Sequence, residues 1–161
     1  MRYRQQGTTI VEFALTVAGL LLLLFFLIEI GRVLFVYNAL AEGTRRGARL
    51  AAVCPVNDPR PKTAVIFTEG GTSLIASGLS IDNVTVEYLN SSGAVVANPT
   101  EATNFLTLRY VRVQVVNYNH HLLIPLFPPY TEWTLSAPAF ASTVPIESLG
   151  YAPSLDSFLP C

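Results

Sequence analysis

Residues 7–52 read GTTIVEFALTVAGLLLLLFFLIEIGRVLFVYNALAEGTRRGARLAA and decide the fold. A short basic leader, MRYRQQG, precedes this stretch as residues 1–7, and no helix breaker follows until Pro55. The pattern predicts one helix over residues 8–53, about 69 Å long at the usual rise per residue. Its first part, about residues 8–30, is apolar enough to span a membrane, because 21 helical residues cover about 31 Å of hydrocarbon.

Two carboxylates flank the charge-free run 13–28. A charge at the centre of a bilayer costs about 2.5–3.5 kcal/mol, so each acid needs an explanation. Glu29 precedes Arg32 by three residues, so an ion pair on one helix face is predicted at the membrane interface. Glu12, near the other end, can snorkel or stay protonated. An acid at this depth is a functional candidate, and the alternative is a tolerated interfacial acid.

Beyond Arg32 the helix becomes amphipathic, with one apolar face. Gly43, Gly47 and Ala51 are spaced four apart, a stripe of small residues that permits close approach of another backbone. The outer half of such a long helix is expected to pack on a head domain or on other subunits. Three arginines (Arg45, Arg46 and Arg49) occupy other faces and suit solvent or lipid phosphates.

Residues 54–161 are predicted to form one small α+β head. Alternating patterns predict strands at 84–88 and 111–115, and a third around 133–139, together an antiparallel sheet of about three strands. Asp58 before Pro59 can cap a second helix running to about Ser77. A strand at 64–68 is the alternative. Residues 120–130, HHLLIPLFPPY, read as an irregular apolar loop.

Composition and charge argue against a nucleic-acid-binding function. The 161 residues carry a net charge of −1 and only 13% charged residues, which gives no electrostatic footprint for nucleic acid.

If Cys54 and Cys161 pair, they close a loop of about 108 residues, which stabilises the fold by about 4.7 kcal/mol in the chain-entropy model. Disulfides persist in the periplasm or outside the cell. The alternative is two unrelated thiols.

No catalytic constellation is evident, and we expect neither a metal nor a cofactor. The adjacent histidines, His120 and His121, point to opposite faces of a strand, so they cannot serve one site together. No acid lies near them at ligand spacing. They are interpreted as the polar end of a strand.

The leader junction resembles a type IV pilin-like precursor, through Gly7, the run Thr8-Thr9-Ile10-Val11, Glu12 and Phe13. The resemblance implies that a prepilin peptidase cuts after Gly7, leaving Thr8 as the new N-terminus and Glu12 as the fifth residue. In an assembly, the Glu12 carboxylate could then pair with the α-amine of a neighbouring Thr8.

The stretch that follows resembles the TadE-like family, minor pilins or pseudopilins of the tight-adherence, Flp-type pilus. Gly31-Arg32, Phe35, Tyr37, Leu40, Glu42 and Arg46-Gly47-Ala48-Arg49 carry this likeness, which covers roughly residues 4–53. The head resembles the family only in outline. The chain departs from it with threonine at positions 8 and 9, where alanine is expected, and without the family's frequent proline after the first apolar turn.

The resemblance implies a single-pass protein of the inner membrane that supports pilus assembly. Residues 1–7 would be cytoplasmic and the head periplasmic or extracellular. The implied partners are the prepilin peptidase, other pilins, the inner-membrane assembly machinery and lipid. Counting the arginines on each side of the span favours the opposite orientation, whereas the cleavage junction and the possible disulfide favour this one. The alternatives are a major filament subunit and, in another class, a signal-anchored periplasmic enzyme or ligand-binding domain.

Overall fold

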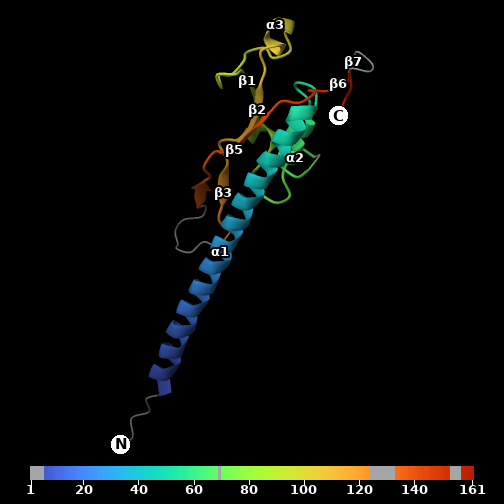
Figure 1. Cartoon of the computed structure of the whole chain (residues 1–161). Helices are drawn as coiled ribbons and strands as arrows, with labels where there is room; N and C mark the ends of the chain where they lie inside the picture. Colours follow the sequence, from blue (N-terminus) through green and yellow to red (C-terminus); the bar gives the residue numbers. More distant parts are fainter. Residues whose placement is uncertain (1–5, 69, 124–132, 153–156) are drawn as a thin grey trace, which may run out of the picture.

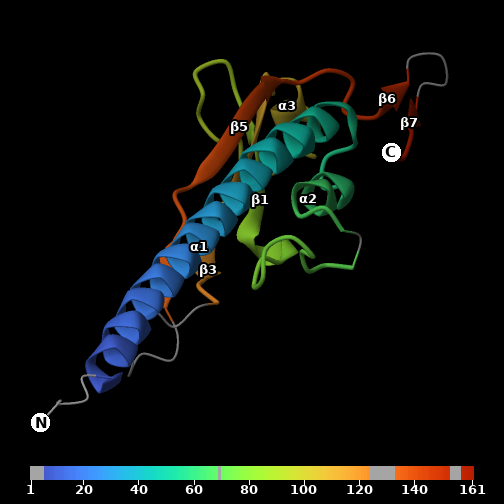
Figure 2. The same cartoon turned by 90° about the horizontal axis from the view of Figure 1, so that it is seen from below.

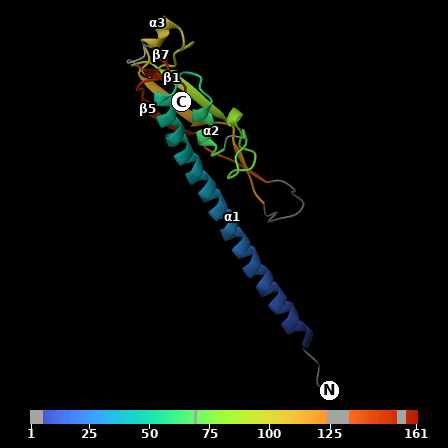
Figure 3. The same cartoon turned by 90° about the vertical axis from the view of Figure 1, so that its right-hand side faces the viewer.

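A computed structural model describes residues 6–68, 70–123, 133–152 and 157–161. One uninterrupted helix, α1 (Gln6–Val53), runs the length of the molecule. Figures 1 and 3 show that its first half stands alone, while the head lies along its second half. The predicted α+β class, with a long N-terminal helix and a small antiparallel head, is therefore confirmed.

The head consists of short elements. They are α2 (Arg60–Val65), the 3-10 turn η1 (Ile81–Asn83), β1 (Val84–Leu89), α3 (Ala102–Phe105), β2 (Tyr110–Val115), β3 (Asn119–His121), β4 (Thr134–Ser136), β5 (Phe140–Pro145), β6 (Tyr151–Ala152) and β7 (Ser157–Phe158). Their order around α1 is visible in Figure 2, where α2 and β5 lie on either side of the helix.

The main sheet is antiparallel with the order β1-β2-β5, and Val113 of β2 pairs with Val86 on one side and Ser142 on the other. Alternation along β2 places Val111, Val113 and Val115 in the core. They pack with the apolar face of the outer half of α1, which contributes Val36, Leu40, Ala48, Ala51 and Ala52. Half of α1 is thus the central core element of the head.

The third strand of the sheet is not where the sequence placed it. Residues 134–136 do form a strand, β4, but it pairs with β3 in a separate two-stranded ribbon. The strand that joins β2 is β5, which begins at Phe140. Pro138 lies between β4 and β5, and its missing N–H cannot continue a ladder, so the chain changes sheets there.

The second helix is much shorter than predicted, and the alternative strand at 64–68 is wrong as well. Asp58 is not the N-cap that the sequence predicts: Pro59 holds that position without a side-chain cap, and Oδ1 of Asp58 accepts a hydrogen bond of 2.8 Å from the N–H of Arg60 in the turn that leads into the helix. The helix ends at Val65, and Phe67 has a φ of 57°, a left-handed backbone that no helix can continue through. Most of the expected apolar loop 120–130 lies outside the described residues.

Candidate functional site

The first half of α1 is bare apolar surface. Its large side chains from Ile10 to Ile28 are exposed, with Phe13 at 69%. Among the described residues, this is one helix long and apolar enough to cross a membrane. Since no other element covers it, the helix fits a single-pass membrane anchor near the N-terminus.

The predicted cleavage junction lies at the start of this anchor. The Gly7–Thr8 bond falls in the first turn of α1, where backbone N–H groups have no partner within the helix. Helix ends fray readily, so this bond is among the least constrained peptide bonds of α1. Five residues into the expected mature chain, Glu12 is exposed on the bare helix, and its carbonyl accepts a hydrogen bond of 2.9 Å from the Thr16 hydroxyl. Within the described parts of the chain, its carboxylate has no hydrogen bond or ion pair.

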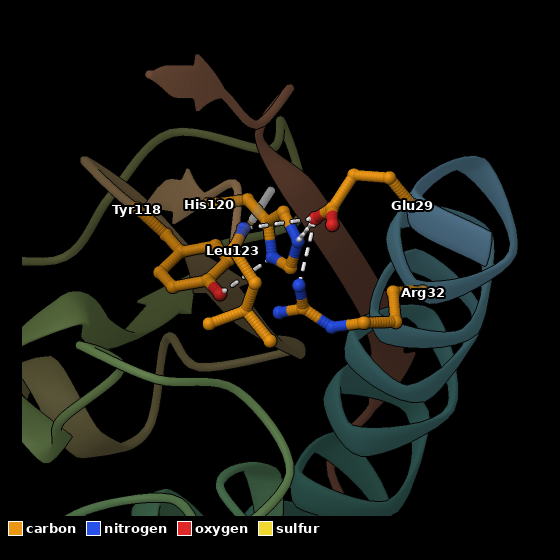
Figure 4. Close-up of polar contacts among 5 residues, drawn as sticks. All are labelled: Glu29, Arg32, Tyr118, His120 and Leu123. Carbon is orange, nitrogen blue, oxygen red and sulfur yellow. Dashed lines mark hydrogen bonds and ion pairs between the residues drawn. The ribbon is translucent and has the colours of Figure 1, made fainter. Parts of the chain in front are cut away.

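The second carboxylate of the anchor, Glu29, has the opposite environment. It is only 3% exposed, and its Oε1 lies 2.7 Å from Nη1 of Arg32, the ion pair that the spacing predicts. The same oxygen accepts a hydrogen bond of 3.3 Å from the backbone N–H of Leu123, just after β3. The other oxygen, Oε2, is buried without a hydrogen bond. Glu29 therefore connects the upper end of the anchor to the head (Figure 4).

A buried histidine completes this cluster. His120, 1% exposed, places its Nε2 at 4.0 Å from Oε1 of Glu29, and its Nδ1 lies 3.2 Å from the hydroxyl of Tyr118. Burial raises the pKa of Tyr118 above its ordinary 10.0, so the phenol stays protonated and can donate to Nδ1. When the Tyr118 hydroxyl donates to Nδ1, a neutral His120 carries its proton on Nε2, the nitrogen that faces Glu29 in Figure 4 and that is buried without a hydrogen bond.

The pKa of His120 is lowered from its ordinary 6.5. The largest cause is burial, followed by the positive charge of Arg32, while Glu29 opposes the shift and His121 adds slightly to it. His120 is therefore held neutral near pH 7. We refer to Glu29, Arg32, Tyr118 and His120 as the junction cluster.

The sequence predicts only part of this cluster. The i,i+3 spacing identifies Glu29 and Arg32, and strand alternation correctly places His120 and His121 on opposite faces, one buried and one exposed. The interpretation of His120 as a polar strand end is wrong, however, because its ring is in the core beside Glu29. The two residues are 91 positions apart, and no local pattern links them.

The small-residue stripe is used inside the head. A Cβ added at Gly43 would collide with the backbone carbonyl of Val65, and one at Gly47 with the side chain of Val65. Ala51, the third member, is completely buried. The stripe therefore lets α2 lie directly on α1. This contact explains why the outer half of α1 needs small side chains. Arg45, Arg46 and Arg49 are exposed on the other faces.

The two cysteines form a disulfide, with Cα atoms 5.3 Å apart and 107 residues of separation. It joins the end of α1 to the last residue of the chain. The preceding tail also contacts the helix end, because the N–H groups of Glu147 and Leu149 donate to the carbonyl of Ala52. Among the described residues, no group of three His, Cys, Asp or Glu side chains could hold a metal.

Residues 7–49 match the family model described as TadE-like protein. The match confirms the resemblance over this stretch, which contains the predicted cleavage junction, the anchor and most of the small-residue stripe. The TadE-like family is a structural family associated with the Tad pilus, and the match leaves the head, residues 54–161, outside it. No curated protein and no solved structure matches the chain.

Proposed function

We propose that this TadE-like chain is a membrane-anchored minor pilin or pseudopilin that supports assembly of a Tad-type pilus. The observation that carries the proposal is the contrast between its two anchor carboxylates. Glu29 is covered and paired within the chain, whereas Glu12 is exposed on a bare apolar helix. An acid in that position is costly in lipid and is stabilised by a positive partner from another molecule.

The partner we propose is the α-amine of Thr8 in a neighbouring subunit, released when prepilin peptidase removes residues 1–7. The leader is cytoplasmic and the head is periplasmic or extracellular in this proposal. The disulfide supports the orientation, since such bonds persist in oxidising compartments. The neighbours are other pilins and the Tad inner-membrane machinery.

Leader removal is tested at Gly7. We expect Gly7→Ala, or a bulkier substitution, to leave residues 1–7 attached, because the peptidase has to accommodate the side chain next to the bond that it cuts. Gly19→Ala is the matched control, since a Cβ there meets no atom within 4 Å. Intact mass and N-terminal sequencing of membrane-extracted protein, with the peptidase present, give the answer. A Gly7 variant of mature mass, or a wild-type chain that still starts at Met1, would contradict the assignment.

Assembly is tested at Glu12. We expect Glu12→Ala and Glu12→Gln to insert into the membrane normally but to lower filament yield at least about tenfold, because an unpaired α-amine is left in the packed core of the filament. Leu15→Ala, equally exposed on the same helix, is the control and should assemble. Carbonate-resistant membrane protein and sheared filaments are measured in each strain. Wild-type piliation in both Glu12 variants would remove the pairing role.

A further inference from the structure

Exposed apolar side chains gather on α1 and on the β3–β4 ribbon at the height of the junction cluster. Three come from α1 itself and three from the β3–β4 ribbon and its ends. They are Ile30, Leu34, Phe35, Leu123, Trp133 and Leu135, each between 41% and 70% exposed. We call this group the apolar collar. Exposed apolar residues that gather at one height of a molecule mark a contact surface, unlike the scattered ones found on any protein.

Hydrogen bonds fix the height of the ribbon side of the collar. The N–H of Leu123 donates to Glu29, and the N–H of Leu122 donates to the carbonyl of Trp133 at 2.9 Å. Leu135 is the register partner of His120, which itself lies beside Glu29. All three ribbon side chains therefore belong to segments that are level with Glu29.

The helix side of the collar points away from the ribbon. At about 100° per residue, Ile30, Leu34 and Phe35 lie about 100°, 140° and 120° from Glu29 around α1. All three are exposed, and Phe35 lies six residues beyond Glu29, about 9 Å further along the axis. The collar thus covers two sides of α1, and its helix side continues the bare surface of the anchor without a gap.

The bilayer is long enough to reach the collar. From Thr8 to Ile28 the helix covers about 31 Å, the thickness of the hydrocarbon core, and the headgroup layer on the head side adds about 5–7 Å, four or so further residues. Ile30 and the ribbon side chains level with Glu29 therefore fall at headgroup depth, and Leu34 and Phe35 lie at the outer edge of that layer. Tryptophan is enriched at this depth, and Arg32, which pairs with Glu29, leaves part of its side chain exposed at the same height.

We infer that the apolar collar, including the lower end of the β3–β4 ribbon, lies in the interfacial layer of the leaflet on the head side while the chain is anchored. This inference rests on the membrane anchor in the proposed function. The occupant is lipid rather than a second copy of the chain, because lipid contacts both exposed sides of the collar at one height and already surrounds the anchor below it, whereas a neighbouring subunit covers one side. The head therefore rests on the membrane surface and does not stand clear of it.

Trp133 is the sole tryptophan of the chain, so its fluorescence reports on the collar. The full-length protein is placed in bilayers whose lipids carry bromine either near the glycerol or near the methyl ends of the acyl chains. We expect bromine near the glycerol to quench Trp133 strongly and deep bromine to quench it weakly. Two further reporters calibrate depth on a Trp133→Phe background, Leu22→Trp in the middle of the anchor and Phe158→Trp in β7, at the far end of the head.

A second arm perturbs the collar. Leu123→Ser combined with Leu135→Ser should shift Trp133 emission to longer wavelength and reduce quenching by shallow bromine. Leu106→Ser is the control, an equally exposed leucine next to α3 and remote from the ribbon, and it should change neither quantity.

The inference is overturned if Trp133 responds like the Phe158→Trp reporter, open to aqueous acrylamide and insensitive to brominated lipid. Shielding from both acrylamide and lipid would show a protein neighbour instead, and would also overturn it. If the Leu22→Trp reporter escapes deep bromine, the anchor itself is absent and the proposed function fails with the inference. Failure of the Gly7 or Glu12 experiments, in contrast, leaves the expected quenching of Trp133 unchanged.

Discussion

Two glutamates in one helix show how environment assigns different roles to the same side chain. Glu29 is neutralised by Arg32 and covered by β3 and its flanking residues, so it serves the internal structure. Glu12 is exposed, so its carboxylate faces the surroundings of the helix. The charge pattern predicts the first pairing, because Glu29 and Arg32 are one turn apart. It cannot predict His120, because contact between residues 91 positions apart depends on the whole fold.

His120 is expected to make the stability of the folded protein sensitive to pH. Its pKa is lowered in the folded state, so below about pH 6.5 the unfolded chain binds a proton that the folded chain resists. The contribution of His120 to the free energy of unfolding is therefore complete above about pH 6.5. It falls on acidification by at most about 1.4 kcal/mol per pH unit. Thermal unfolding of the detergent-solubilised protein, followed between about pH 7.5 and 5.5, measures this slope.

Variants at two adjacent positions distinguish the buried ring of His120 from the exposed ring of His121. His120→Gln should flatten the slope, because it removes the titrating group, whereas His121→Gln should retain it. Equal slopes in both variants would show that acid sensitivity comes from other groups.

At the scale of elements, α1 was the most predictable part. Its expected span of 8–53 agrees with the observed Gln6–Val53, because a long apolar run without a breaker leaves few alternatives. The strands β1 and β2 follow from alternation. The partner of β2 could not be foreseen, since residues 133–139 alternate in the sequence whereas residues 140–145, FASTVP, do not. The choice between them is made by the tertiary pairing of β3 with β4.

The packing of α2 on α1 gives a test at the same scale. Gly43→Ala should destabilise the head by roughly 1–3 kcal/mol, because the new methyl group would overlap the Val65 carbonyl and lie 3.2 Å from the Phe67 ring. Gly31→Ala is the matched control, since a Cβ there meets nothing within 4 Å and alanine favours a helix by up to about 1 kcal/mol. Thermal unfolding should therefore shift downward for the first variant only. A neutral Gly43→Ala would mean that α2 can move away from α1 freely.

At the scale of the whole molecule, the disulfide closes the head. We expect Cys54→Ser with Cys161→Ser to lower the free energy of unfolding by up to about 4.7 kcal/mol, because the unfolded chain regains the freedom of a loop of 107 residues. Each single variant, and reduced wild-type protein, should unfold at the temperature of the double variant. A double variant as stable as the oxidised wild type would show that the tail is held by its contacts with Ala52 and Val53 alone.

The same bond determines how the molecule carries a load. A pull applied between the start of α1 and Cys161 passes along α1 to Val53 and crosses the bond between Cys54 and Cys161. The sheet and the ribbons are arranged on a closed loop beside this route and bear none of the tension. A molecule built in this way can be stretched between these two points without its head unravelling, for as long as the two sulfurs stay joined.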